Sequence, residues 1–221
     1  MMDGEGGVGF DWATARHRMV ESQLRPVGVS DLRLLARFAR VERERYVPAD
    51  VRALAYADAL VPLGGGRAMN PPMATALLIQ AGEPRQSDRT LLIGAGTGYA
   101  AAILAPLVGT LVALEDGELK MPQLERENTA ATQHVVGRLT DGHAAGAPYD
   151  LVVIDGAVDA VPAAIVAQMA PGGRLVTGVF ENGVGRLCAG RRVGAGLSLR
   201  PMMEATVAEL PSFAIPAGFV F

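Results

Sequence analysis

Apolar runs separated by turns and helical segments recur through the second half of the chain. The runs at 90–93, 111–115, 133–139, 149–156 and 174–180 are mostly continuous rather than alternating, and continuous apolar strands are typical of a parallel sheet with both faces covered. Five strand–helix repeats of this kind predict a doubly wound sheet with right-handed crossovers. Strand-like pieces at 186–188 and 205–208 add two antiparallel closing strands. We therefore expect an α/β fold with a mostly parallel sheet of about seven strands.

Helical spacing of apolar residues dominates the first third of the chain. Segments 10–24 and 30–41 have this pattern, and Ser30 is a good N-cap for the second. A loop rich in Gly and Pro spans 61–72 and leads into a helix over 73–81. Further helices are expected at 99–105, 122–132 and 162–169. We expect one domain over 1–221, with a flexible start at 1–9, an N-terminal helical extension and substrate-side loop at 10–72, and a cofactor-binding α/β core at 73–221.

The apolar run that ends at Ile93 continues directly into Gly94-Ala95-Gly96-Thr97-Gly98 and then into a helix. Glycine tolerates positive φ and lets another group approach the backbone closely, so this strand–turn–helix predicts a nucleotide-type binding site. A glycine-rich turn can also simply connect a strand to a helix. The turn therefore requires a second signal before it identifies a site.

That second signal is Glu115, which ends the next apolar run 21 residues after Gly94. An acid about 20 residues after the first glycine reaches the ribose hydroxyls in nucleotide-binding βαβ units. A carboxylate suits this position because it can accept hydrogen bonds from both hydroxyls of a vicinal diol. The other interpretation is a solvated acid at a strand end, and Asp116 is the neighbouring candidate.

The turn at 140–142 follows the third strand of the core. Carboxyl ends of parallel strands share one edge of the sheet, where ligands bind, so Asp141 and Gly142 are expected beside the glycine turn and Glu115. Asp141 can accept a hydrogen bond from an adenine amino group. Asp155, at the end of the fourth strand, belongs to the same edge.

The glycine spacing distinguishes two cofactor classes. A dinucleotide fingerprint Gly-x-Gly-x-x-Gly would need a third glycine at position 99, which is Tyr99, whereas Gly-x-Gly-x-Gly is satisfied at 94, 96 and 98. The chain also has no evident constellation of Lys, Tyr or His for hydride transfer. S-adenosylmethionine is therefore favoured, within a Rossmann-like fold of the methyltransferase kind.

Composition narrows the possible partners and location. A formal net charge of −3 argues against a broad surface for nucleic acid, and the apolar runs are too short for a membrane helix. The N-terminus lacks the basic start and apolar core of a secretory signal, and Cys188 is the single cysteine, so we expect a soluble, cytoplasmic protein without a disulfide. The three histidines lack ligand spacing, and no metal is assigned.

Short motifs are spread over most of the chain, at 19–24, Val47-Pro48, 55–64 with Tyr56, Asp58 and Val61-Pro62, 93–99, Asp141-Gly142, 147–150 and 172–175. In these motifs the chain resembles the protein-L-isoaspartate O-methyltransferases. The resemblance implies methyl transfer from S-adenosylmethionine to the free carboxylate of an L-isoaspartyl residue. It also implies that the turn 94–98 binds the methionine part of the cofactor, Glu115 the ribose and Asp141 the adenine. The acceptor is then a protein or peptide carboxylate, or a related small-molecule carboxylate.

The chain departs from the family pattern around Asn70. Where the family has Gly-Gln-Thr-Ile-Ser-Gln-Pro, this chain has Gly66-Arg67-Ala68-Met69-Asn70-Pro71-Pro72, and Leu92 replaces an acid. Asn70 thus stands at the serine of the family's active site, although it can also be a simple N-cap. Arg67 can pair bidentately with a substrate carboxylate, or it is a solvated loop charge.

These departures leave two functions open. The first is methyl transfer to a carboxylate, which needs no general base because the acceptor is already ionised near neutral pH. The second is a catalytically degenerate paralogue that binds S-adenosylmethionine as a sensor or partner-binding module.

Overall fold

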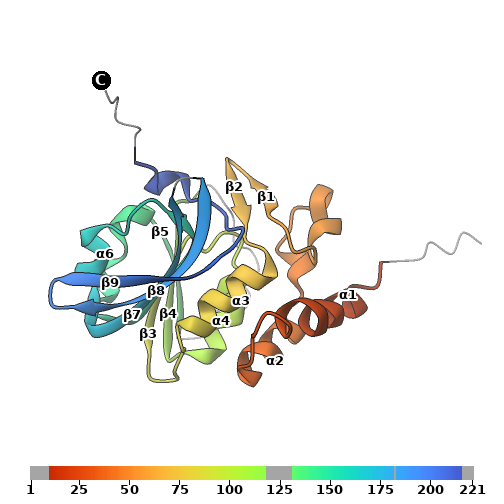
Figure 1. Ribbon diagram of the computed structural model, residues 1–221, viewed down its shortest axis with the longest axis horizontal. Coiled ribbons are helices and arrows are strands. Elements are labelled where there is room, and N and C mark those ends of the chain that lie inside the picture. Colours follow the sequence, from red (N-terminus) through yellow and green to blue (C-terminus); the bar gives the residue numbers. More distant parts are fainter. Residues whose placement is uncertain (1–9, 118–130, 182, 216–221) are drawn as a thin grey trace, which may run out of the picture.

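A seven-stranded sheet with the order β5-β4-β3-β6-β7-β8-β9 forms the centre of the molecule (Figure 1). The computed structural model describes residues 10–117, 131–181 and 183–215. Strands β3 to β7 run parallel, whereas β8 and β9 are antiparallel to their neighbours. The predicted doubly wound, mostly parallel sheet is confirmed. Its strands are β3 (Arg89–Ile93), β4 (Thr110–Glu115), β5 (Thr132–Val136), β6 (Tyr149–Val158), β7 (Met169–Glu181), β8 (Val184–Val193) and β9 (Gly196–Glu204).

The central strand β6 shows why its sequence is apolar throughout. Leu151 and Val153 point into the hydrophobic cluster on one face of the sheet, which also includes residues of the N-terminal helices. Val152 and Ile154 belong to the cluster on the opposite face. Both sets of side chains are at most 1% exposed. The continuous apolar run therefore follows from burial on both faces of a parallel sheet.

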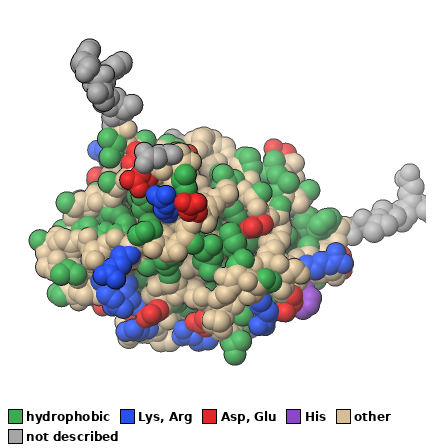
Figure 2. Space-filling view, viewed as in Figure 1, with side chains coloured by type: hydrophobic (Ala, Val, Ile, Leu, Met, Phe, Trp, Pro, Cys, Tyr) green, Lys and Arg blue, Asp and Glu red, His purple; other side chains and the backbone are tan. Residues whose placement is uncertain are grey.

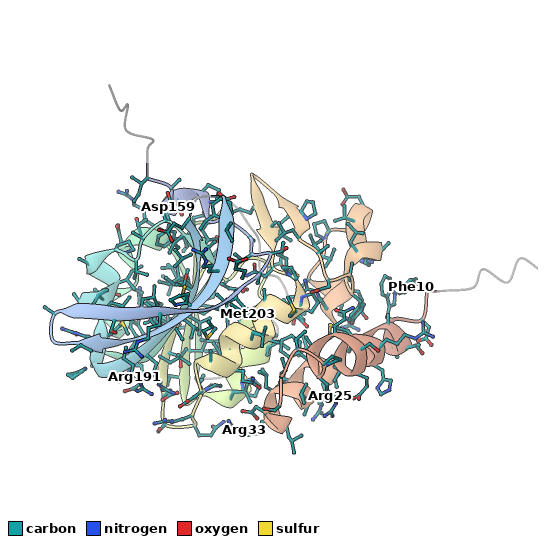
Figure 3. All side chains as sticks on the ribbon, viewed as in Figure 1. Phe10, Arg25, Arg33, Asp159, Arg191 and Met203 are labelled. Carbon is teal, nitrogen blue, oxygen red and sulfur yellow. The ribbon has the colours of Figure 1, made fainter. Side chains whose placement is uncertain are left out.

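Helices cover both faces of this sheet, and side chains fill the space between them and the strands (Figures 1 and 3). α3 and α4 lie on the face that also meets the N-terminal helices, while α6 lies on the other. The first helix continues through Leu24 as predicted, with its last turn in π-helical form. The helices are α1 (Trp12–Met19) with the π turn Val20–Leu24, α2 (Leu32–Arg40), α3 (Pro72–Ala81), α4 (Tyr99–Leu104) and α6 (Ala163–Ala167).

Short 3-10 turns connect these elements. They cover Arg43–Arg45, Ala49–Leu54, Ala105–Leu107, Leu139–Asp141, Ala144–Gly146 and Pro211–Phe213. The predicted helix at 122–132 falls mostly outside the described residues, and its last residue, Thr132, instead begins β5. The predicted flexible start at 1–9 also lies outside them. Within the described residues, no helix has the length and apolar character needed to cross a bilayer.

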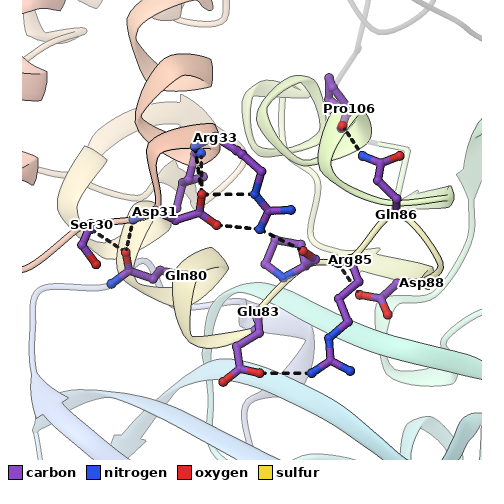
Figure 4. A network of polar contacts seen from close by, with 12 residues as sticks. Ser30, Asp31, Arg33, Gln80, Glu83, Arg85, Gln86, Asp88 and Pro106 are labelled. Atoms are coloured by element: carbon purple, nitrogen blue, oxygen red, sulfur yellow. Dashed lines mark hydrogen bonds and ion pairs between the residues drawn. The ribbon is translucent and has the colours of Figure 1, made fainter.

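The N-terminal helices are tied to α3 by a network of polar contacts (Figure 4). Gln80 near the end of α3 accepts hydrogen bonds from the backbone N–H groups of Ser30 and Asp31, at 2.7 and 3.1 Å. Asp31, rather than Ser30, is the N-cap of α2, since its carboxylate accepts from the N–H of Arg33 at 2.8 Å. The expected cap was therefore wrong by one residue, because the Asp31 carboxylate accepts the free N–H groups of both Arg33 and Leu34 in the first turn.

Three segments differ from their predicted form. The region 61–72 is not only a loop, since it contains the antiparallel hairpin β1 (Val61–Gly64) and β2 (Arg67–Met69). Gly65 and Gly66 connect the two strands at φ of +57° and +73°, and two residues with positive φ make the tight turn that suits a hairpin. The glycines and prolines that indicated a loop therefore belong to a hairpin and its turn.

The second difference is at 205–208, where the prediction of a closing strand was wrong. The last strand is β9, at 196–204, and the chain beyond it returns to the end of β6. There the N–H of Ala157 donates to the carbonyl of Ala208 at 2.7 Å, and the N–H of Leu210 donates to the carbonyl of Ala157 at 2.9 Å.

The third difference is the helix predicted at 162–169. It ends at Ala167 because β7 already begins at Met169.

Candidate active site

The glycine turn links β3 to α4 and lies against the next strand. Gly94, Gly96 and Gly98 have φ values of +73°, +58° and +97°, a region that residues with a Cβ rarely adopt. The N–H groups of Gly94 and Ala95 both donate to the carbonyl of Leu114 on β4, at 3.1 and 3.2 Å. All four residues of 93–96 are buried. The turn is therefore a fixed element at the carboxyl edge of the sheet.

The N-terminal segment contacts this turn from the other side. Thr97 donates its hydroxyl to the carbonyl of Tyr46 at 2.6 Å. The fully buried Arg43 places its guanidinium carbon 4.6 Å from the ring centroid of Tyr99, and it donates to the carbonyl of Asn70 at 2.7 Å. A cation held over an aromatic ring and by a carbonyl has little freedom. Arg43 thus connects the loop around Asn70 to the first residue of α4.

Glu115 ends β4 directly beside the turn and is completely buried. Its Oε2 accepts the backbone N–H of Gly96 at 2.5 Å, and its Oε1 accepts the N–H of Asp116 at 3.0 Å. The interpretation of Glu115 as a solvated strand-end acid is wrong. The carboxylate is instead buried and hydrogen-bonded at the carboxyl edge of the sheet, the position predicted from its spacing to Gly94.

Arg67 is the main partner of that carboxylate. Its Nη1 donates to Oε1 of Glu115 at 2.5 Å and its Nη2 to Oε2 at 3.2 Å, while Nη1 also reaches Asp116 at 3.2 Å. The Arg67 side chain is only 4% exposed, so its interpretation as a solvated loop charge is wrong. Arg67 does pair bidentately with a carboxylate, but in this structure the carboxylate belongs to the chain itself.

Both polar atoms of the Asn70 side chain have hydrogen-bond partners. It is 1% exposed, its Nδ2 donates to Oδ1 of Asp155 at 2.8 Å, and its Oδ1 accepts the N–H of Ala208 at 2.7 Å. The N-cap of α3 is Pro71, without a side-chain bond, so the N-cap interpretation of Asn70 is wrong. Asn70 joins β2, the end of β6 and the C-terminal segment at one point.

Asp155 lies at the centre of this polar group and is partly buried. Thr75 on α3 also donates to its Oδ1, at 3.3 Å. Burial raises the pKa of Asp155, while the hydrogen bonds from Asn70 and Thr75 and the charges of Arg43 and Arg67 act against that shift. Asp155 is thus an acid whose neutral form is favoured relative to that of an exposed aspartate.

Asp141 and Gly142 follow β5, the strand next to β4. The Asp141 side chain is 65% exposed, and its nearest cation is Arg138 at 4.0 Å. Gln168 fixes the turn by donating to the carbonyl of Asp141 at 2.7 Å. Gly142 has φ of +65° and ψ of −148°, a conformation that is essentially confined to glycine. The carboxylate of Asp141 therefore faces solvent from a rigid turn.

Several residues of this site were not predicted from the sequence. Asp155 was expected at this edge, but its partners were not predicted, and no sequence pattern indicated Arg43, Thr75 or Ala208. A buried arginine in a polar segment looks the same in sequence as an exposed one. Their roles depend on contacts between residues far apart in the chain.

Neither a metal site nor a basic surface stands out. Within 10–117, 131–181 and 183–215, no group of three or more His, Cys, Asp or Glu side chains has the geometry of a metal site. Acidic and basic side chains are interspersed on the face shown in Figure 2. Cys188 is 5% exposed, as expected for a small buried side chain.

Comparisons with known proteins agree on one family. A sequence model of the protein-L-isoaspartate(D-aspartate) O-methyltransferases matches residues 15–205. A protein-L-isoaspartate O-methyltransferase of Methylorubrum populi is 42% identical over 173 residues, which cover 76% of this chain and 81% of that protein. One from Methanoculleus marisnigri is 36% identical over 168 residues, covering 74% and 76% respectively.

Solved structures show the same fold. A protein-L-isoaspartate O-methyltransferase superimposes with a TM-score of 0.75 at 22% identity, covering 88% of this chain and 65% of the other. A Plasmodium falciparum protein described as a protein-L-isoaspartate O-methyltransferase in complex with S-adenosyl-L-homocysteine gives 0.72 at 13% identity, with coverage of 90% and 97%. The family model and the identity to curated relatives together show that this chain belongs to the protein-L-isoaspartate O-methyltransferase family.

Proposed function

We propose that this chain transfers a methyl group from S-adenosylmethionine to the free carboxylate of an isoaspartyl residue in a protein or peptide. The observation that carries the proposal is the family match over residues 15–205. It agrees with a carboxyl edge at which Glu115 is buried beside the glycine turn.

The residues around the turn fit the adenosyl part of this cofactor. A buried carboxylate such as Glu115 suits a ribose diol, because it accepts hydrogen bonds without offering a donor. A Cβ on Gly94 would lie 3.1 Å from methyl carbons of Leu210 and 3.6 Å from Nη2 of Arg67, so glycine is what lets these side chains approach the turn this closely. We propose that residues 94–98 hold the methionine part, Glu115 the ribose, and Asp141 with Gly142 the adenine.

The main task of the protein in this reaction is to align the acceptor carboxylate with the methyl group of the cofactor. When bound, S-adenosylmethionine supplies an electrophilic methyl group: a carboxylate oxygen forms the new O–C bond while the S–C bond breaks and its electron pair stays on sulfur. The acceptor carboxylate is already ionised near neutral pH, so no residue has to remove a proton. Positioning and exclusion of water are what the buried edge can contribute.

Asn70 therefore does not need the hydroxyl of the family serine. In our proposal it positions Asp155, the chain segment at Ala208 and the end of β2, through the three contacts described above. The positive charges of Arg43 and Arg67 act on this point, which favours an anionic acceptor nearby. Arg67 supplies the cation that an acceptor carboxylate requires.

The test is transfer of a labelled methyl group to an isoaspartyl peptide. The matched control is the same peptide with an ordinary aspartate, which has the same atoms and net charge but a different backbone connection. We expect label in the isoaspartyl peptide alone, and base-labile, as a methyl ester should be. Equal labelling of both peptides would contradict isoaspartyl specificity.

A second candidate function is cofactor binding without turnover. The observation that favours it is that Asn70, at the position of the family serine, is buried with its side-chain nitrogen and oxygen bound to Asp155 and Ala208. Binding of S-adenosylhomocysteine without transfer to any peptide or small-molecule carboxylate would support this candidate and contradict the first.

We further propose that residues 10–72 and 73–221 act as one domain in the cytoplasm, without nucleic acid or a metal as partner. The shared hydrophobic cluster between the N-terminal helices and the sheet supports the single domain. Expression with a fused reporter and limited proteolysis would test the location and the domain assignment.

A further inference from the structure

The hairpin β1–β2 lies directly on the glycine turn. A Cβ on Gly96 would meet Cδ1 of Leu63 at 3.4 Å, and one on Gly94 would meet Nη2 of Arg67 at 3.6 Å. Gly94 and Gly96 are buried although they have no side chains of their own. Side chains of the hairpin thus fill space beside the turn that we assign to the cofactor.

The carboxylate of Glu115 is saturated in this arrangement. It accepts four hydrogen bonds, from Nη1 and Nη2 of Arg67 and from the backbone N–H groups of Gly96 and Asp116. A carboxylate has about four lone-pair sites. The two hydroxyls of a ribose can therefore bind Glu115 only if existing donors leave it.

Arg67 is the donor that can leave. The two backbone N–H groups belong to the fixed turn and to the end of β4, whereas Arg67 extends from a three-residue strand next to a Gly-Gly turn. Its Nε, moreover, is buried and finds no acceptor among the described residues. The guanidinium is thus held by its two terminal nitrogens and lacks the full set of partners that would fix it in place.

We propose that Arg67 is a latch that exchanges partners during the reaction: the cofactor ribose replaces it on Glu115, and the released guanidinium then binds the acceptor carboxylate. This inference rests on the proposed function, because it assumes that Glu115 holds the ribose. β2 leads from Arg67 to Asn70 within three residues, so the released cation stays on the acceptor side of the site. Because Arg67 is free to bind the acceptor only after the ribose has displaced it from Glu115, the cofactor binds before the acceptor.

The charges explain why the exchange has a direction. Without cofactor, the buried Glu115 needs a cation, because a buried and unpaired carboxylate is costly. Once two hydroxyls donate to Glu115, its charge is hydrogen-bonded without Arg67. The guanidinium then keeps only its single contact with Asp116 at 3.2 Å, and a carboxylate of the acceptor can restore the bidentate geometry that it had with Glu115.

The test is calorimetric binding of S-adenosylhomocysteine, and then of an isoaspartyl peptide, to the wild type and to Arg67→Met. Removing the latch should tighten S-adenosylhomocysteine by about 5- to 100-fold. The same substitution should abolish peptide binding to the S-adenosylhomocysteine complex. In the wild type, the peptide should bind only after S-adenosylhomocysteine. Opposite effects on the two ligands are not expected from general damage to the fold.

Two further variants keep the outcome decisive. Arg67→Lys retains the charge but cannot bridge both oxygens, so it should give an intermediate tightening if Arg67→Met does not fold. Arg85→Met, at an exposed arginine paired with Glu83 at 3.3 Å, is the matched control and should change neither affinity.

Weaker or unchanged S-adenosylhomocysteine binding in both Arg67 variants would overturn the latch. The proposed function fails separately. If Glu115→Gln leaves S-adenosylhomocysteine affinity unchanged, Glu115 does not hold the ribose and the latch falls with it. If the wild-type complex binds no isoaspartyl peptide while Arg67→Met still tightens S-adenosylhomocysteine, the ribose exchange stands and the acceptor half of the proposal is wrong.

Discussion

Arg67 and Glu115 stand 48 positions apart in the chain and form a buried bidentate ion pair, with N–O distances of 2.5 and 3.2 Å. The arginine comes from the hairpin β1–β2 and the glutamate from the end of β4, the strand that follows the glycine turn. In our proposal, the pair joins the acceptor side of the site to the cofactor side. Its two members lead to different predictions for binding and for stability.

The first prediction concerns the cofactor affinity of Glu115→Ala. Removing the carboxylate takes away the acceptor that we propose for two ribose hydroxyls, and losing hydrogen bonds to a charged group in a buried site costs about 1 to 3 kcal/mol. We expect S-adenosylhomocysteine to bind more weakly by that amount in titration calorimetry. Glu83→Ala, at a side chain that is 62% exposed, should bind like the wild type, and an unchanged affinity in Glu115→Ala would refute the assignment.

The second prediction concerns stability without ligand. Arg67→Met leaves Glu115 buried without its cation, and breaking a buried ion pair on one side typically costs about 3 to 5 kcal/mol. The free energy of unfolding from urea titration should fall by about this amount. The double variant Arg67→Met with Glu115→Met removes both charges and should recover most of the loss. Equal losses in the single and double variants would show that packing, not the unpaired charge, is responsible.

The third prediction follows from the raised pKa of Asp155, which burial causes. A carboxyl with a higher pKa in the folded than in the unfolded protein contributes stability below its unfolded pKa, and this contribution is lost as the pH rises through the folded value. Asp155→Asn keeps the shape and stays neutral. It should match the wild type in strongly acidic solution and become relatively more stable as the pH rises to neutral.

The size of this effect is about 1.4 kcal/mol for each unit by which the pKa is raised. Urea titrations of both proteins from pH 4 upwards would measure it. Asp159→Asn, at an acid outside this site, is the control. A stability difference that stays constant over the whole pH range would contradict the raised pKa.

The fourth prediction concerns Asn70→Ser, which restores the residue of the family pattern. A serine side chain is shorter and cannot serve both Asp155 and the N–H of Ala208, so one buried polar group loses its partner at a cost of about 1 to 3 kcal/mol. We expect a lower midpoint of urea unfolding. Because the acceptor carboxylate needs no base, methyl transfer should not increase, and a large gain in transfer would mean that the hydroxyl takes part in the reaction.

Much of the fold could be predicted because its signals are local. The strands of the core are continuous apolar runs, and burial on both faces of a parallel sheet requires that composition. The glycine turn could be placed because positive φ at Gly94, Gly96 and Gly98 demands glycine. Glu115 could be placed because one βαβ unit has a nearly constant length.

The tertiary structure decided what those residues touch. Asn70 and Ala208 are 138 positions apart, and nothing in either segment indicates the other. The hairpin at 61–69 was predicted as a loop because Gly and Pro mark hairpin turns and loops alike. Whether Arg67 is a solvated charge or a buried partner of Glu115 depends on where that hairpin packs.

The sequence by itself therefore determined the sheet, the glycine turn and the acid at the end of β4, since periodicity, backbone conformation and loop length act over short stretches of chain. Only the tertiary structure decided that Arg67 covers the turn and that Asn70 holds Asp155. Such contacts arise from the order of strands in the sheet and from the free-energy cost of leaving a buried charge or amide without a partner.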